Sequence, residues 1–101
     1  MTFREFLRQQ LARNLPVFMD GGIGTMIQKS GVTDYAIPED LNQSHPDIIK
    51  SIHRQYLEAG SNVLTANSFG LNPLKDNESD YPWQDLLISS IILQQEAIAE
   101  F

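Results

Sequence analysis

Apolar residues recur at helical intervals near the start of the chain. Thr2 and Glu5 have the spacing of a capping box, in which each side chain accepts a hydrogen bond from the other residue's backbone N–H. The apolar positions of this stretch are Phe3, Phe6, Leu7 and Leu11. The pattern predicts a short amphipathic helix over residues 2–14, which Pro16 ends.

Two further helical patterns lie in the middle and at the end of the chain. The first starts at Ser44, with Pro46 in its first turn and Gly60 as a stop signal. Its apolar face carries Ile48, Ile49, Ile52, Tyr56 and Leu57. The second follows Pro82, and it predicts a helix over residues 83–101. Its expected core positions are Leu86, Leu87, Ile91, Leu93 and Ile98.

Two short apolar runs, "PVFMD" at residues 16–20 and "SNVLTANSFG" at residues 61–70, read as buried strands. Because a helix is predicted between them, they would pair in parallel as a βαβ unit. The stretches 32–43 and 70–82 have no clear period and read as loops. Two strands with open edges are few for a parallel sheet, so the pattern predicts the opening piece of a larger α/β domain.

Composition narrows the possible functions. The chain has 101 residues, of which 42% are hydrophobic, and a formal net charge of −6, which indicates a small globular unit. Residues 76–101 carry six acidic side chains and no Lys or Arg, which argues against a nucleic-acid partner. The absence of cysteine excludes disulfides and thiolate chemistry from these residues. No apolar run spans a membrane, so we expect no membrane partner and a cytoplasmic location.

The glycine-rich stretch "DGGIGT" at residues 20–25 is the main candidate for chemistry. It lacks the spacing of a dinucleotide fingerprint and of a Walker loop. One interpretation is a tight turn that Asp20 caps. In the other, Asp20 holds an ammonium group at the end of a strand, while the backbone N–H groups of Gly21 and Gly22 approach a carboxylate. Asn67 lies at the end of the second strand. It is either a polar residue that merely ends the strand or a residue that faces the same site as Asp20.

The histidines and the acidic run receive no chemical role. His45 and His53 lack a third ligand for a metal, so packing or surface positions are expected for both. Asp76, Glu78 and Asp80 are expected in a solvated loop that favours the N-terminus of the next helix.

Four segments, "DGGIGTMIQ", "PEDLN", "HPDIIKSIHRQYLEAGSNVL" and "NSFG", together resemble the start of the homocysteine S-methyltransferase family. This family includes the homocysteine-binding barrel of cobalamin-dependent methionine synthase and betaine-homocysteine methyltransferase. The resemblance, over about residues 17–70, implies the N-terminal βαβα portion of a (β/α)8 TIM-type barrel, incomplete in this chain. Residues 1–101 would be a partial homocysteine-binding domain, with residues 2–14 as a leading helix.

The resemblance also implies a substrate and a metal. Homocysteine would bind at the carboxyl ends of the strands, with Asp20, Gly21, Gly22 and Asn67 as its binding residues in this chain. In the family, zinc held by three cysteine thiolates activates the thiol of homocysteine for methyl transfer. This chain has no cysteine, so we assign it no catalytic residue and no metal ligand.

Three functional hypotheses follow. The first is an N-terminal fragment of a zinc-dependent homocysteine S-methyltransferase, which would make methionine but is expected to be inactive alone. The second is half of a split barrel, completed by a partner chain that carries the cysteines. The third is a non-catalytic interaction module that uses the acidic C-terminal helix.

Overall fold

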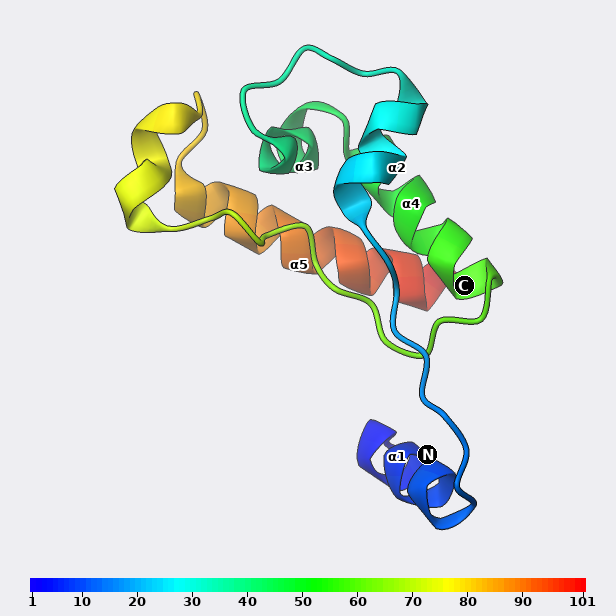
Figure 1. Ribbon diagram of the computed structural model, residues 1–101. Coiled ribbons are helices and arrows are strands. Elements are labelled where there is room, and N and C mark those ends of the chain that lie inside the picture. The colour runs from blue at the N-terminus through cyan, green and yellow to red at the C-terminus, as the bar shows by residue number, and fades with distance from the viewer.

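The computed structural model describes residues 1–101, apart from the side chain of Lys75. Its regular structure is helical (Figure 1). In chain order the elements are α1 (Phe3–Ala12), α2 (Ile23–Ser30), η1 (Pro38–Asp40), α3 (Leu41–Ser44), α4 (Pro46–Glu58), η2 (Pro73–Glu78) and α5 (Trp83–Glu100), where η1 and η2 are 3-10 helices.

The predicted α/β fold, a βαβα portion of a TIM-type barrel, is wrong, because the described residues form no sheet. The two predicted strands do run side by side in parallel, but they share a single bridge between Met19 and Val63. Phe18 is 59% exposed and Met19 is 63% exposed. Since a parallel sheet needs further strands and cover on both faces, this isolated pair does not grow into one.

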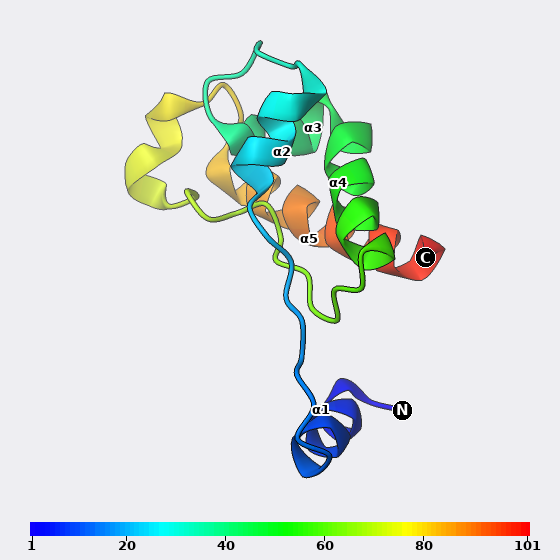
Figure 2. The ribbon, with the colours of Figure 1, turned by 45° about the vertical axis from the view of Figure 1, so that its right-hand side comes forward.

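The helix predicted for residues 2–14 is confirmed as α1. Its capping box is present: Thr2 Oγ1 accepts from the Glu5 N–H at 3.1 Å, and Glu5 Oε2 accepts from the Thr2 N–H at 3.2 Å. The helix has no buried residue, and both views show it apart from the other helices at the end of an extended segment (Figure 2). It therefore contributes nothing to the core.

The core lies where α2, α3, α4 and α5 meet. Its buried side chains are Ile27, Leu41, Ile49, Ile52 and Leu93. Helix α4 packs against both α2 and α5, and its predicted apolar face supplies two of these residues. Its predicted stop is also confirmed, because Gly60 follows the helix at φ 106°, which only glycine adopts readily. His45 rather than Ser44 is the residue that precedes the helix.

Helix α5 begins after Pro82, as predicted, and Asp76 helps to start it. The Asp76 carboxylate accepts a hydrogen bond from the Trp83 N–H at 2.9 Å. The predicted core positions Ile91 and Ile98 are wrong, since their side chains are 43% and 51% exposed. The predicted core positions Leu86 and Leu93 are confirmed, and Ser90 and Ala97 complete the buried face at helical intervals. Within the described residues, no helix is long and apolar enough to span a membrane.

The acidic end of α5 is paired within the chain. Lys50 of α4 lies 3.2 Å from Glu96 and 2.6 Å from Glu100, while Arg54 lies 3.5 Å from Glu100. The hydrogen bonds that the Lys50 ammonium donates to Glu100 and Glu96 raise the pKa of Lys50. The charges on this face of α5 therefore join it to α4.

Candidate functional site

A cavity of about 440 Å³ opens beside the bridge between the two extended segments. Three of the four predicted binding residues, Asp20, Gly21 and Asn67, line it. Gly22 is not one of its lining residues. The others that line it are Met19, Ile23, Gly24, Pro38, Glu39, Thr65, Ala66, Ser68 and Phe69. The structure thus brings together the "DGGIG" stretch and the residues around Asn67, as the sequence predicts.

The Asp20 carboxylate is already engaged within the chain. Its Oδ2 accepts from the Thr65 N–H at 2.8 Å, and its Oδ1 accepts from the Thr65 hydroxyl at 3.0 Å. The Asp20 N–H donates to the Val63 carbonyl at 3.0 Å. Asp20 therefore fastens the two walls of the cavity to each other, as well as contributing negative charge to it.

Tyr56 lies against Gly21 and leaves little room for a side chain there. A Cβ atom at this position would fall 2.8 Å from the Tyr56 hydroxyl oxygen. That hydroxyl donates to the Gly22 carbonyl at 2.8 Å, so α4 holds the glycine segment in place. The alternative interpretation, a tight turn capped by Asp20, is wrong: the glycines with positive φ among the described residues are Gly31 and Gly60, and the Asp20 carboxylate bonds to Thr65.

Helix α2, which the sequence pattern does not predict, starts directly at the cavity. Its N-terminal residues Ile23 and Gly24 line the cavity. Gly22 precedes the helix and supplies no side-chain cap. The first N–H groups of a helix have no partner within the helix and carry partial positive charge, which suits a carboxylate.

Asn67 and Asn42 form a buried amide pair behind the cavity. Asn67 Nδ2 donates to Asn42 Oδ1 at 3.0 Å and to the Pro38 carbonyl at 3.1 Å. Asn42 Nδ2 donates to the carbonyls of Asn67 and Leu86, each at 3.0 Å. The pair joins the segment around Asn67 to α3, η1 and α5. Asn42 is not among the sequence-predicted site residues, and its only signal in the sequence is its place in "PEDLN".

Glu39, in the same short stretch, was also missed. Its side chain is 5% exposed and lines the cavity. Oε1 accepts from the Gly70 N–H at 2.9 Å, and a Cβ atom at Gly70 would lie 2.8 Å from this oxygen. The neighbouring Asp40 is not a lining residue; its carboxylate accepts from the N–H groups of Ala36 and Ile37 and from the Ser79 hydroxyl.

Homology now adds to this geometry. A model of the homocysteine S-methyltransferase family matches residues 17–101. The chain belongs to this family. The methionine synthases of Mycobacterium leprae (strain TN) and Mycobacterium tuberculosis (strain ATCC 25618 / H37Rv) are each 38% identical to it over 72 residues. This alignment covers 65% of the chain but 6% of either relative. No solved structure matches the chain.

The family match confirms the resemblance drawn from the four sequence segments. It does not supply a zinc site, because the residues of this chain do not fit one. The chain has no cysteine, and the described residues hold no group of three His, Asp or Glu side chains that would bind a metal. The expected zinc therefore has no ligand set within the described residues.

The histidines of this family member lie outside the cavity lining. His53 on α4 is fully buried, and neither ring nitrogen has a hydrogen-bond partner. Burial lowers the pKa of His53, while the negative charge of Asp20 acts in the opposite direction. His45 instead contacts the Ser44 hydroxyl through Nδ1 at 2.9 Å.

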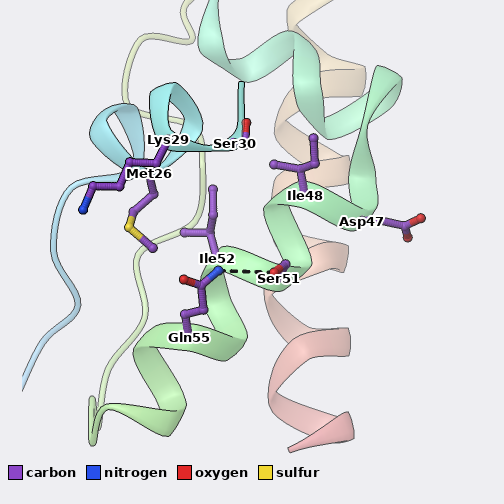
Figure 3. A pocket seen from close by; sticks show the side chains of 8 residues that line it. All are labelled: Met26, Lys29, Ser30, Asp47, Ile48, Ser51, Ile52 and Gln55. Carbon is purple, nitrogen blue, oxygen red and sulfur yellow. Dashed lines mark hydrogen bonds between the residues drawn. The ribbon is translucent and has the colours of Figure 1, made fainter. Parts of the chain in front are cut away.

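A second cavity, of about 380 Å³, lies between α2 and α4 (Figure 3). Its charged residues Lys29 and Asp47 point away from each other. Its polar residues Gln55 and Ser51 hydrogen-bond along the same helix at 3.3 Å. Because no charged groups converge here, this cavity is the poorer candidate for a small polar ligand.

Proposed function

We propose that this chain forms the part of a homocysteine S-methyltransferase that binds the amino-acid end of homocysteine. The observation that carries the proposal is the cavity of about 440 Å³ between the "DGGIG" stretch and Asn67, in a chain whose family is established. A cavity of this size suits a small ligand. The reaction of such an enzyme would transfer a methyl group to the homocysteine thiol and give methionine.

The cavity lining offers two kinds of charged or polar group. Asp20 and Glu39 bring carboxylates to it, while the uncapped N-terminus of α2 brings N–H groups. An amino acid carries an ammonium and a carboxylate on neighbouring atoms, and the two kinds of group match these two features. This arrangement supports an α-amino acid over a purely anionic ligand.

The chemical step is assigned to residues other than these 101. Zinc would lower the pKa of the homocysteine thiol and so favour the attacking thiolate. Because the described residues offer it no ligand set, we derive no step through the metal. The chain alone is proposed to bind homocysteine without methylating it, as a fragment would.

The interaction-module hypothesis receives less support. That module would use the acidic C-terminal helix, and two of the acidic residues of this helix, Glu96 and Glu100, pair with cations of α4. An acidic partner-binding face would need these carboxylates unpaired.

Isothermal titration calorimetry of the purified chain tests the proposal. We expect saturable one-to-one binding of L-homocysteine. D-homocysteine should bind more weakly, because its ammonium and carboxylate groups exchange places when its thiol arm points the same way. A second titration with inorganic sulfate controls for non-specific anion binding at α2. Absence of any saturable binding of L-homocysteine would contradict the proposed function.

A further inference from the structure

The side chain of Glu39 places a negative charge in the cavity with little compensation. It is 5% exposed, and only Oε1 has a hydrogen-bond partner among the described residues, the Gly70 N–H at 2.9 Å. No Lys, Arg or His side chain that the structure describes lies within ion-pair distance of it. Oε2 is therefore left with unused capacity to accept hydrogen bonds.

Asp20, the other carboxylate of the cavity, differs from Glu39 in its hydrogen bonds and its burial. Each Asp20 oxygen already accepts one hydrogen bond from Thr65, and Asp20 is half-buried rather than buried. A buried carboxylate is unfavourable unless it is paired with a cation or fully hydrogen-bonded. Because Glu39 is more buried and has fewer hydrogen-bond partners than Asp20, a cationic ligand should stabilise the Glu39 carboxylate more.

The chemistry of the missing cation can be narrowed. A divalent metal takes several oxygen ligands, and only Asp20 and Glu39 bring carboxylates to this cavity. An ammonium group carries three N–H donors and can be bound by fewer oxygen atoms than a divalent metal requires, and the free Oε2 of Glu39 is one such acceptor. The cavity therefore favours an organic ammonium over a metal ion.

We propose that Glu39 binds the α-ammonium group of the amino-acid ligand through Oε2, while Asp20 chiefly fastens the cavity walls through Thr65. This inference rests on the proposed function, because it takes homocysteine as the ligand. It assigns the charge recognition to a residue that neither the sequence pattern nor the resemblance identified. Gly70 then has a defined role, since its N–H holds Oε1 and leaves Oε2 to the ligand.

The substitution Glu39→Gln separates binding from a merely structural role. Glutamine keeps an oxygen that accepts from the Gly70 N–H, but it removes the negative charge. Glu58→Gln, at an exposed position of α4 outside the cavity, is the matched control. Circular dichroism and thermal unfolding establish that each variant is folded before its binding is compared.

Calorimetry then compares L-homocysteine with 4-mercaptobutanoate, which keeps the thiol and carboxylate but lacks the ammonium group. For Glu39→Gln we expect homocysteine affinity to fall roughly tenfold or more, as for the loss of a charge-assisted hydrogen bond. The affinity for 4-mercaptobutanoate should stay within about twofold of the wild-type value, which is a negligible difference in binding free energy. Glu58→Gln should change neither affinity.

The outcomes of these titrations test the role of Glu39 separately from the proposed function. Unchanged homocysteine affinity in folded Glu39→Gln overturns the inference and leaves the proposed function in place. An equal loss for both compounds also overturns it, because the residue would then act on the cavity's shape. If the chain binds L-methionine but not homocysteine, and Glu39→Gln weakens that binding, the inference stands and the proposed substrate is wrong. Binding of none of these compounds contradicts both.

Discussion

Asp20 and Thr65 join two segments that lie 45 residues apart in the chain, with the Asp20 carboxylate accepting from both the N–H and the hydroxyl of Thr65. These contacts lie directly beside the parallel bridge from Met19 to Val63. The position of the cavity therefore depends on a side-chain link as well as on the backbone.

Replacing Thr65 with valine should loosen this link without breaking it. Valine keeps the N–H but loses the hydroxyl, so the free energy of unfolding should fall by about 1 kcal/mol, the usual net value of one hydrogen bond. Urea denaturation followed by circular dichroism measures this change. Thr33→Val, at an exposed threonine, is the control and should cost less. Equal effects at the two positions would contradict a structural role for the Asp20–Thr65 contact.

The Asn42–Asn67 pair should behave as one unit. Asn42→Ala leaves the Asn67 and Leu86 carbonyls without their donor, and it should cost about 1–3 kcal/mol, as expected for buried polar groups left unpaired. Asn67→Ala removes donors to Asn42 and Pro38 and should also destabilise. The double variant should lose less than the two losses added together, because the amides share a contact.

Urea denaturation of the two single variants and the double variant forms the corresponding double-mutant cycle. Asn77→Ala, at an exposed asparagine of η2, provides the reference for a surface substitution. Strict additivity of the two buried substitutions would show that the amides act independently.

The helices were the more predictable part of the fold, because their signals are local. Thr2 and Glu5 cap α1 within one turn. Gly60 follows α4 with a positive φ, which glycine adopts more readily than other residues. Helix α2 was missed because Gly22 and Gly24 read as breakers. Its end was nevertheless marked: Gly31 follows it at φ 84°, a usual glycine stop after a helix.

The strands, and site residues such as Glu39, depend on contacts with segments that are far away in the sequence. Val63 has the β-propensity of a strand residue, yet a sheet also needs neighbouring strands, which a local pattern does not report. Asp20 was identified from its position after an apolar run. Glu39 lies in a stretch without periodicity, and its importance appears only when Gly70 folds against it.

Stability should depend on pH through His53. Burial lowers the pKa of His53 below its ordinary value of about 6.5, so the unfolded chain binds this proton more readily than the folded chain. Stability from the neutral ring is therefore fully present above about pH 6.5 and is lost as the pH falls toward the lowered pKa. Urea denaturation midpoints between about pH 5.5 and 7.5 should fall as the solution becomes more acidic.

His53→Leu removes the titrating group and should flatten this dependence. It should cost little stability at neutral pH, because both ring nitrogens lack partners in the buried site. His45→Gln is the control, since it removes the other histidine and retains His53. A pH slope that persists in His53→Leu would assign the effect to other groups.

Two glycines of the same stretch should respond to alanine in opposite directions. At Gly21 the new Cβ atom would lie 2.8 Å from the Tyr56 hydroxyl oxygen, so Tyr56 must shift and strain its bond to the Gly22 carbonyl. We expect Gly21→Ala to lower the free energy of unfolding by about 1–2 kcal/mol, within the range for overpacking. At Gly24, inside α2, no atom lies within 4 Å of the added Cβ. Gly24→Ala should therefore stabilise the chain by up to about 1 kcal/mol through helix propensity.

Adding Tyr56→Phe tests the cause of the Gly21 effect. Phenylalanine removes the 2.8 Å contact and leaves ring carbons at 3.2 and 3.3 Å from the added Cβ position. Gly21→Ala should then cost less in the Tyr56→Phe background than in the wild-type chain, as urea denaturation of the four proteins would measure. The same cost in both backgrounds would mean that the glycine serves the backbone or the ligand rather than the approach of Tyr56.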